Sequence, residues 1–213
     1  MIKHTLLSAI FLILVLSCNN DKPINLSIAK KEVKEYYDSG KFDEEIKLVV
    51  DEAIEKLKNV KFNENSTVVF DIDETALSGY DYALQIDFGY DLDSWTEWQL
   101  KADAPAIQDV KRLYDYLVDK NVYIVFLTGK RDVTCESAYN NLIEAGYTKI
   151  DTLICRSKDE YKLKAEEYKA YHRKELTEAG FEIIMSVGDQ KSDLVGEFTG
   201  IKVKIPNYLY TIH

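Results

Sequence analysis

The chain has 213 residues and a mass of 24.5 kDa, which suits one domain of moderate size that buries its own hydrophobic core. Hydrophobic residues make up 46% and charged residues 30%, as in folded globular proteins, and the net charge of −10 argues against a nucleic-acid binder with a basic face. The sequence contains only three histidines, His4, His172 and His213, which argues against chemistry that needs a histidine pair and leaves carboxylates as the abundant reactive groups.

The first residues resemble an export signal. Lys3 precedes the apolar run 6–16, which is too short to span a bilayer, and residues 15–18 (Val-Leu-Ser-Cys) resemble a bacterial lipobox. We therefore expect a signal peptide at 1–17, lipidation of Cys18, a polar tether at 18–26 and an exported bacterial lipoprotein of the outer membrane or periplasm. The alternative is an ordinary signal peptide with a coincidental cysteine.

The first half of the remaining chain predicts a helical segment, a strand and an insertion. Apolar residues recur every three or four positions within 27–60, which is a helical spacing, and the run 67–70 is typical of a buried strand. Residues 76–104 are rich in aromatic side chains. We interpret them as a small cap insertion with one short helix around 94–101, inside a domain that spans 27–213.

The second half predicts alternating helices and strands. In chain order these are a helix at 105–120, a strand at 122–127, a helix at 133–145, a strand at 150–155, a helix at 158–179, and strands at 181–187 and 201–205. Strands that are apolar on both faces, with helices between them, predict an α/β fold with a doubly wound, Rossmann-like parallel sheet.

Polar residues follow the predicted strands at the edge where such sheets bind ligands. They are Asp71, Asp73, Thr128, Asp189 and Asp193. Carboxylates crowded together raise each other's pKa unless a cation lies among them, and Mg²⁺ is suited to a few carboxylates, waters and a substrate phosphate. Two carboxylates two residues apart can serve as nucleophile and proton shuttle, and a hydroxyl can bind phosphate oxygens.

Four sequence segments carry a resemblance to a known family. Residues 71–75 (Asp-Ile-Asp-Glu-Thr), 127–129 (Leu-Thr-Gly), a helix lysine and 188–193 (Gly-Asp-Gln-Lys-Ser-Asp) resemble the motifs of the haloacid dehalogenase (HAD) superfamily. Further segments resemble subfamily IIIB, which contains bacterial class C-type acid phosphatases and plant vegetative-storage-protein acid phosphatases: 95–98, 104–106, 126–129, 141–142, 145–147 and 205–207. The resemblance covers roughly residues 30–212 and implies a HAD-like fold.

The resemblance also implies roles for the acidic residues. Asp71 would become the aspartyl phosphate, and Asp73 would protonate the leaving group, then activate water, with its backbone carbonyl on the metal. Asp189 would bind Mg²⁺, and Asp193 would bind it directly or through water. Thr128 would hold the phosphoryl group. The implied metal site therefore comprises Asp71, Asp73, Asp189 and Asp193.

The phosphate-binding lysine is chosen by the same resemblance. The segment 168–173 resembles the family's Tyr-Lys-Ser-x-x-Arg pattern and favours Lys169 as the phosphate-binding lysine, with Lys174 as the alternative. The full set expected to contact substrate or phosphate is Ile72, Tyr80, Trp95, Thr128, Gly129, Lys130, Lys169 and Arg173. The aromatic side chains of the insertion either pack the cap or stack on a nucleobase or aryl group.

The chain departs from the family pattern at two positions. Lys130 stands where an arginine commonly follows Thr-Gly, and Cys135 stands where a second arginine is expected, so the substrate preference is expected to differ. Cys135 and Cys155 are predicted near the same end of the sheet, either as a disulfide or as two separate small hydrophobic residues. His172 is expected to be a solvated or partly packed helix residue and not a catalyst.

The sequence therefore predicts a Mg²⁺-dependent acid phosphatase that hydrolyses small phosphate monoesters, with nucleoside monophosphates as candidates. Its expected partners are a small phosphorylated substrate and a membrane, through the lipid anchor, and no nucleic-acid polymer. Two alternatives remain: a non-catalytic storage or binding protein on the same fold, and a phosphotransferase. The sequence leaves the oligomeric state open.

Overall fold

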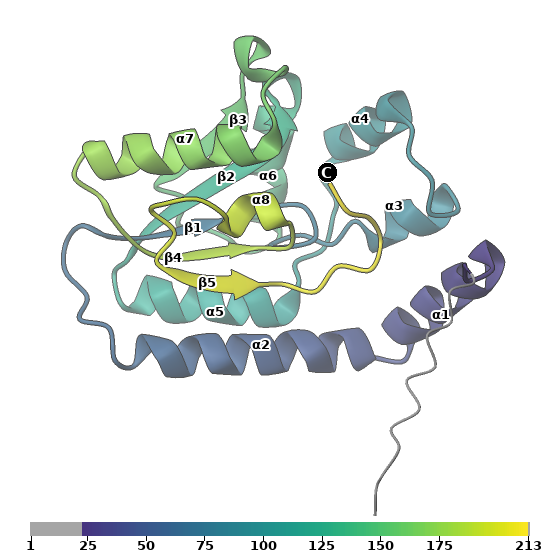
Figure 1. The fold of residues 1–213 in the computed structure, drawn as a ribbon, viewed down its shortest axis with the longest axis horizontal. Helices are drawn as coiled ribbons and strands as arrows, with labels where there is room; N and C mark the ends of the chain where they lie inside the picture. The colour runs from purple at the N-terminus through teal and green to yellow at the C-terminus, as the bar shows by residue number, and fades with distance from the viewer. Residues whose placement is uncertain (1–22, 213) are drawn as a thin grey trace, which may run out of the picture.

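A five-stranded parallel sheet forms the centre of the computed structural model, which describes residues 23–212 (Figure 1). The strands are β1 Ser66–Phe70, β2 Tyr123–Arg131, β3 Thr152–Arg156, β4 Glu182–Gly188 and β5 Ile201–Lys204. Their spatial order is β3-β2-β1-β4-β5, so the chain reverses its winding direction beside β1. This confirms the predicted α/β fold with a doubly wound parallel sheet.

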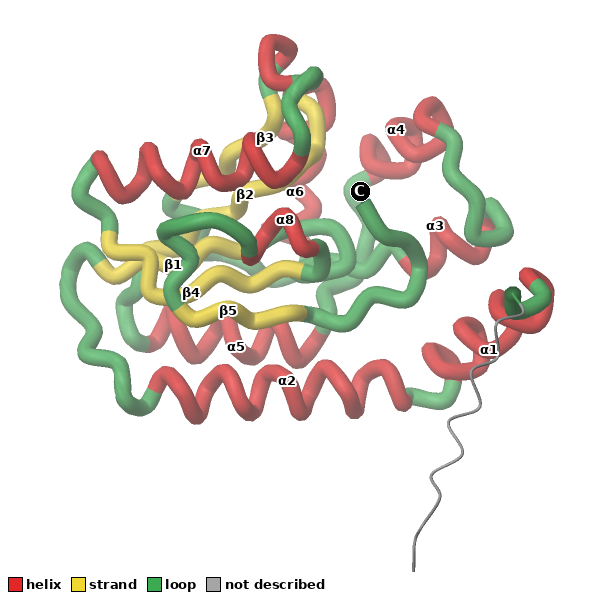
Figure 2. Tube along the Cα trace, viewed as in Figure 1, coloured by secondary structure: helices red, strands yellow, loops and turns green. Residues whose placement is uncertain are grey.

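Helices cover both faces of the sheet, as Figure 2 shows for α2 and α5 on one side and α7 on the other. The helices are α1 Leu26–Asp38, α2 Lys41–Leu57, α3 Tyr80–Gln85, α4 Leu92–Lys101, α5 Gln108–Asp119, α6 Cys135–Glu144, α7 Ala165–Glu178 and α8 Lys191–Leu194, with 3-10 turns at Asp132–Thr134 and Lys158–Glu160.

The strands read as continuous apolar runs because each one is buried on both faces. In β1, Val68 and Phe70 pack into the larger core with α2, α5 and α6, whereas Val69 packs into a second core with Tyr168 and Leu176 of α7. This alternation follows from the two-residue period of a strand. The free energy of burying apolar area on both faces therefore fixes the sheet in the middle of the domain.

Three helical regions differ from the prediction. The helix expected over 27–60 divides into α1 and α2 at Gly40, whose φ of 78° is a left-handed conformation that suits glycine. The helix expected over 158–179 begins with a separate turn, where Ser157 and Glu160 form a capping box, and α7 starts only at Ala165. The cap contains α3 in addition to the predicted helix, which is α4.

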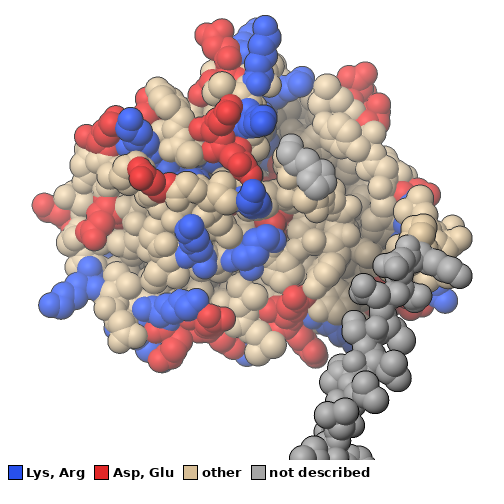
Figure 3. Space-filling view, in the orientation of Figure 1, with Lys and Arg blue, Asp and Glu red and all other residues tan. Residues whose placement is uncertain are grey.

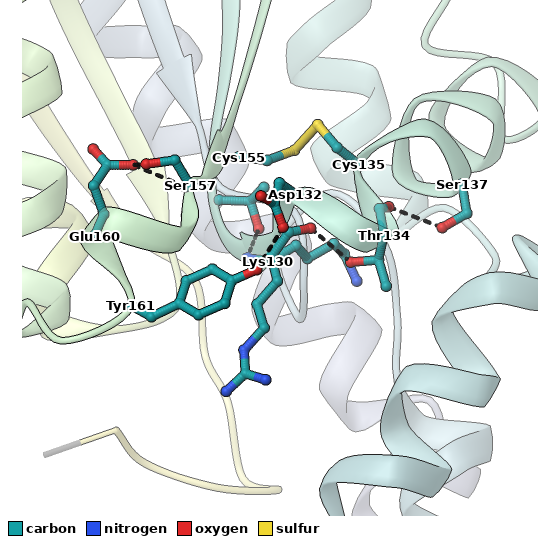
Figure 4. Close-up of a disulfide and its surroundings, with 11 residues drawn as sticks. Lys130, Asp132, Thr134, Cys135, Ser137, Cys155, Ser157, Glu160 and Tyr161 are labelled. Atoms are coloured by element: carbon teal, nitrogen blue, oxygen red, sulfur yellow. Dashed lines mark hydrogen bonds between the residues drawn. A yellow bond between two sulfur atoms is a disulfide. The ribbon is translucent and has the colours of Figure 1, made fainter.

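A disulfide joins Cys135, at the start of α6, to Cys155 of β3, with the two Cα atoms 5.9 Å apart (Figure 4). Hydrogen bonds organise the surrounding turns: Ser137 Oγ donates to the carbonyl of Thr134, and Ser157 Oγ donates to Glu160. The structure thus selects the disulfide from the two alternatives that the sequence leaves open.

The predicted signal peptide 1–17, the lipidation site Cys18 and the tether as far as residue 22 lie outside the described residues. Within residues 23–212, none of the helices has the length and apolar character needed to cross a bilayer. Acidic and basic side chains of the described residues are interspersed over the face shown in Figure 3, so charge on that face is spread and not gathered into one patch of a single sign.

Candidate active site

The ends of β1 and β4 bring three carboxylates together. These strands are neighbours, with Phe70 opposite Val187, so Asp71 and Asp189 follow them at the same edge of the sheet. Oxygen atoms of Asp71, Asp189 and Asp193 all lie within 4.8 Å of one another, and the three residues are buried. The sequence prediction that these carboxylates converge is thus realised in the structure.

The turn after β4 folds Asp193 back toward the sheet. The backbone N–H of Gln190 donates to Asp193 Oδ2 at 2.8 Å, which caps α8. A Cβ atom on Gly188 would lie 2.2 Å from the Cβ atom of Asp193. Glycine at this position therefore permits the close approach that places the Asp193 carboxylate beside Asp189.

Lys169 supplies a positive charge inside the cluster. Its Nζ lies 2.6 Å from Asp71 Oδ1 and also donates to Asp193 Oδ1. Burial by itself would lower the pKa of Lys169, but the Asp193 and Asp71 carboxylates raise that pKa overall, so the lysine is protonated. This placement agrees with the choice of Lys169 over Lys174, which is exposed on α7 and pairs with Glu178.

The cluster suits a divalent cation. Burial raises the pKa of Asp71 well above its usual value and also raises the pKa of Asp189, in each case reinforced by repulsion from neighbouring carboxylates. Lys169 is the cation paired with this group, through Asp71 and Asp193, so one positive charge faces three carboxyl groups. The donor set consists of hard oxygen atoms, which are the ligands that divalent cations such as Mg²⁺ prefer.

The side chain of Asp73 lies apart from the other three. Its Oδ1 is 2.7 Å from Lys130 Nζ, and it does not belong to the group of carboxylates that converge among the described residues. The expectation that four carboxylates converge is therefore corrected to three, and the expected contact of the Asp73 backbone carbonyl with the metal stays a prediction. Asp73 instead lines the same cavity as Asp71.

Thr128 and Gly129 leave the regular strand pairing between β2 and β3. Leu127 pairs with Ile154 and Arg131 with Arg156, so three residues of β2 stand opposite the single residue Cys155. This bulge turns Thr128, Gly129 and Lys130 into the cavity lining, and the backbone N–H of Lys130 donates to Thr128 Oγ1 at 3.1 Å.

A cavity of about 620 Å³ opens above these groups. Its walls are the carboxylates, the 128–130 bulge, aromatic side chains of the cap and the C-terminal residues 209–212. The aromatic residues that line it are Tyr82, Phe88, Tyr90, Trp95 and Tyr210. Figure 1 shows α3, α4 and the C-terminal segment together beside the edge of the sheet where the strands end. Trp95 therefore lines the site as expected.

Three predicted contact residues lie elsewhere. Tyr80 points away from the cavity: its hydroxyl donates to Asp38 Oδ1 at 2.8 Å and its ring stacks on Tyr37, which attaches the cap to α1. The Ile72 side chain is fully buried in the larger core. The buried Arg173 donates to the carbonyls of Asp193 and Val195, so its guanidinium supports the turn that carries Asp193.

His172 agrees with the expectation of a partly packed helix residue. Its Nε2 lies 2.7 Å from Glu160 and its Nδ1 lies 3.0 Å from Glu175. It is not among the residues that line the cavity.

The sequence did not indicate several residues that line the cavity or contact its carboxylates. Glu74 belongs to the 71–75 motif, yet it was given no role; it accepts hydrogen bonds from the Gly79 backbone and from the Tyr210 hydroxyl. Asn207 belongs to the 205–207 segment and donates to Asp189 Oδ2 at 2.6 Å. Membership of these motifs was the available signal. Gln99, Arg156 and residues 209–212 carried no comparable signal because only the tertiary fold brings them to the site.

Comparison with known proteins assigns a family to this arrangement. The model of the HAD superfamily, subfamily IIIB (acid phosphatase), matches residues 17–213. The chain belongs to this subfamily. It is 33% identical over 189 residues to Acid phosphatase 1 of Solanum lycopersicum, covering 84% of this chain and 73% of that protein. It is also 31% identical over 185 residues to the Stem 28 kDa glycoprotein of Glycine max, again covering 84% and 73%.

Solved structures support the fold of this acid phosphatase. The class C acid phosphatase from Bacillus anthracis superposes with a TM-score of 0.71 at 19% sequence identity, covering 87% of this chain and 85% of that one. A second structure of that enzyme, with tungstate bound, gives a TM-score of 0.69. The predicted family, fold and enzyme class are confirmed: the protein is a phosphomonoesterase.

Proposed function

We propose that this acid phosphatase hydrolyses small phosphate monoesters with Mg²⁺ through an aspartyl phosphate formed on Asp71. The observation that carries the proposal is the position of the Asp71 carboxylate. It is buried at the base of the cavity, beside Asp189 and Asp193, and Lys169 Nζ lies 2.6 Å from its Oδ1. A carboxylate in such surroundings is placed to attack a phosphorus atom that enters from the cavity.

The reaction needs one proton shuttle, which we assign to Asp73. In the first step a carboxylate oxygen of Asp71 bonds to phosphorus while the bond from phosphorus to the ester oxygen breaks, and the leaving oxygen takes the proton of Asp73. In the second step Asp73 takes a proton from water, the water oxygen bonds to phosphorus, and the bond between Asp71 and phosphorus breaks. Phosphate leaves, and Asp73 is protonated again.

Other side chains offset the charge of the phosphoryl group. Lys169 is held protonated by its two carboxylate partners, and the Thr128 hydroxyl and the Gly129 N–H belong to the bulge that faces the cavity. Mg²⁺ held by Asp71, Asp189 and Asp193, with the backbone carbonyl of Asp73, would supply the remaining positive charge. The buried carboxylates and their raised pKa values support a cation at this position.

Nucleoside monophosphates are the substrate class that we favour. Trp95 stacks on Trp98 with ring centroids 5.1 Å apart, and Lys130 Nζ lies 5.2 Å from the Trp95 ring centroid. Trp95 forms an aromatic wall of the cavity with Tyr82 and Tyr90, and the buried Trp98 lies behind it. A planar base or aryl group can stack on such a wall, and a volume of about 620 Å³ is typical of sites for small ligands.

We also propose the domain order 1–17 signal peptide, 18–26 tether and 27–213 phosphatase domain, with a cap over 76–104 and a lipid on Cys18. The support comes from the lipobox-like residues 15–18. Replacing Cys18 with alanine should move the protein from the membrane to the soluble fraction of a bacterial host. Unchanged partitioning would reject the lipid anchor.

The central test is hydrolysis of p-nitrophenyl phosphate by the purified protein with Mg²⁺. We expect Asp71→Asn to lower kcat by more than about 10³-fold, because the amide cannot act as nucleophile, and excess EDTA to abolish turnover. Asp159→Asn is the matched control, since Asp159 is exposed and does not line the cavity, and its replacement changes the net charge equally. Full activity of Asp71→Asn or of the EDTA-treated protein would reject the mechanism.

Two further measurements separate the alternatives. A storage or binding protein would show no turnover, and trapping of BeF₃⁻ at Asp71 would then test whether the nucleophile is competent. A phosphotransferase would pass the phosphoryl group to an added alcohol such as glycerol, which product analysis detects as glycerol phosphate.

A further inference from the structure

Arg156 is a cavity cation to which neither the sequence motifs nor the proposed reaction gives a task. It is the last residue of β3 and lines the cavity together with Lys130 and Lys169. Both lysines are paired with carboxylates. Among residues 23–212, Arg156 forms no ion pair within 4.0 Å, and its buried Nε has no hydrogen-bond partner. Its charge is therefore available to a ligand.

The guanidinium of Arg156 is held in a defined position. Its Cζ lies 4.7 Å from the ring centroid of Tyr168, and Tyr168 is fully buried in α7, one residue before Lys169. The preceding residue, Cys155, is tied to α6 by the disulfide. An arginine side chain that is stacked on a buried ring is already ordered before an anion binds. It therefore loses less conformational entropy on binding than an arginine side chain that moves freely.

Arg156 is not part of the ion-pair network around Asp71. Lys169, and not Arg156, pairs with Asp71, and no carboxylate of the cluster lies within 4.0 Å of the Arg156 guanidinium among the described residues. Arg156 instead ends β3 beside the bulge that carries Thr128 and Gly129. An anion bound by Arg156 would therefore lie in the cavity beside this bulge, in addition to the phosphoryl group that Asp71 and Lys169 receive.

We propose that Arg156 is a specificity-determining residue that binds a second anionic group, a phosphate or a carboxylate, on the leaving-group side of the substrate. Guanidinium groups bind both anions through paired N–H donors. Preferred substrates are then phosphate monoesters that carry a second anion. A nucleoside bisphosphate would satisfy both the aromatic wall and Arg156. The proposal rests on the proposed phosphatase reaction and narrows its substrate class.

The test compares three flexible substrates that differ only at the far end of the leaving group: butyl phosphate, 4-carboxybutyl phosphate and butane-1,4-diyl bisphosphate. We expect the wild-type protein to show a higher kcat/KM for the two substrates with a second anion. Arg156→Met should reduce that preference by about 10- to 100-fold, mainly through KM, which is the range for a lost hydrogen bond to a charged group. The substrate whose kcat/KM falls more in Arg156→Met shows whether Arg156 binds a carboxylate or a phosphate.

Arg131→Met is the matched control. Arg131 pairs with Arg156 in the strand register, but its guanidinium stacks on Tyr161 and does not line the cavity, so this variant loses the same charge nearby. We expect it to keep the preference. Three results would overturn the proposal: no preference in the wild type, equal losses for all three substrates in Arg156→Met, or an equal effect of Arg131→Met.

A binding experiment distinguishes failure of the proposed phosphatase reaction from failure of the proposed role of Arg156. If the wild-type protein does not hydrolyse butyl phosphate, the proposed function is rejected, and calorimetry with butane-1,4-bisphosphonate and butylphosphonate in the presence of Mg²⁺ then tests Arg156 alone. Tighter binding of the bisphosphonate by the wild type, lost in Arg156→Met, would support the anion site. Equal affinities in the two proteins would reject it.

Discussion

Glu74 is an acid held where its charge is disfavoured. Burial raises its pKa to about 8, with repulsion from Asp73 and Asp189 adding to the shift, while hydrogen bonds from the Tyr210 hydroxyl and the Gly79 backbone oppose it. Its φ of 53° is a left-handed conformation that non-glycine residues rarely adopt. The residue that links the 71–75 turn to the C-terminal segment is therefore neutral over much of the acidic range.

The raised pKa of Glu74 makes the stability of the metal-free protein depend on pH. Between its unfolded value near 4.5 and its folded value of about 8, the folded state binds more protons than the unfolded state, so the free energy of unfolding falls as pH rises. We expect a loss on the order of several kcal/mol across that interval. Glu74→Gln, which keeps the shape and does not ionise, should flatten this dependence.

The measurement is urea denaturation in EDTA at pH 5, 6, 7 and 8 for both proteins. Glu97→Gln is the control, because Glu97 is an exposed carboxyl of the cap helix α4. An unchanged pH slope in Glu74→Gln would show that Glu74 is ionised in the folded protein at neutral pH.

The sequence predicted which carboxylates meet at the strand ends, and it was wrong about the positions of Arg173 and Tyr80, whose side chains are placed by tertiary contacts. Asp71 and Asp189 are fixed by strand ends, so their meeting follows from the sheet topology alone. Arg173 lies one helical turn from Lys169, yet its guanidinium reaches two carbonyls and not the cavity. Tyr80 was assigned to the site from its aromatic character, whereas its hydroxyl is bound by Asp38 of α1.

At the scale of elements, the disulfide joins β3 to α6 across a sequence separation of 20 residues. A cross-link of this length is expected to stabilise the fold by about 3 kcal/mol, chiefly by restricting the unfolded chain. The double variant Cys135→Ala/Cys155→Ala should therefore unfold at a temperature lower by about 6–12 °C.

Thermal unfolding followed by circular dichroism, with and without a reducing agent, measures this effect. The wild type should lose most of the difference when it is reduced, and the double variant should not respond. A double variant as stable as the oxidised wild type would contradict the prediction. It would show that the unfolded chain between residues 135 and 155 is already compact, so that the disulfide adds no stability.

The sheet was predictable because its strands are buried on both faces, which leaves continuous apolar runs in the sequence. The helix boundaries were less predictable than the sheet. Gly40 has a left-handed conformation and breaks an otherwise helical pattern. The helices α3 and α8 are only six and four residues long, which is too short to show a helical repeat of apolar residues in the sequence. The disulfide could be narrowed only to two alternatives, because pairing needs the distance between β3 and α6.

At the scale of the whole molecule, the site is assembled from three parts of the fold. The sheet edge supplies the carboxylates, the cap supplies the aromatic wall, and residues 209–212 close the remaining side, with the Ile212 N–H donating to Gln190 Oε1 at 2.9 Å. The sequence predicted the first two from motif and composition. Nothing in the spacing of residues 209–212 indicates that the chain returns to the sheet edge, because that path depends on packing of the finished fold.

The convergence of acids in a chain of net charge −10 leads to a prediction for the whole domain. Without a cation, the carboxylates of Asp71, Asp189 and Asp193 repel one another in a buried position that a single lysine only partly offsets. A cation that binds the folded state and not the unfolded chain stabilises by about 2.7 kcal/mol at 100 times its Kd. We therefore expect saturating Mg²⁺ to raise the unfolding temperature by about 5–11 °C.

Differential scanning fluorimetry in EDTA and in Mg²⁺, at matched ionic strength, measures this shift. Asp189→Asn should abolish most of it, because the variant removes one of the three converging oxygen donors, and it should be the more stable protein in EDTA because it also removes part of the repulsion. Asp115→Asn, a change to an exposed carboxylate of α5, should retain the full shift. Equal Mg²⁺ responses in the two variants would place the stabilising cation elsewhere on the acidic surface, since general screening of charge acts on both variants alike.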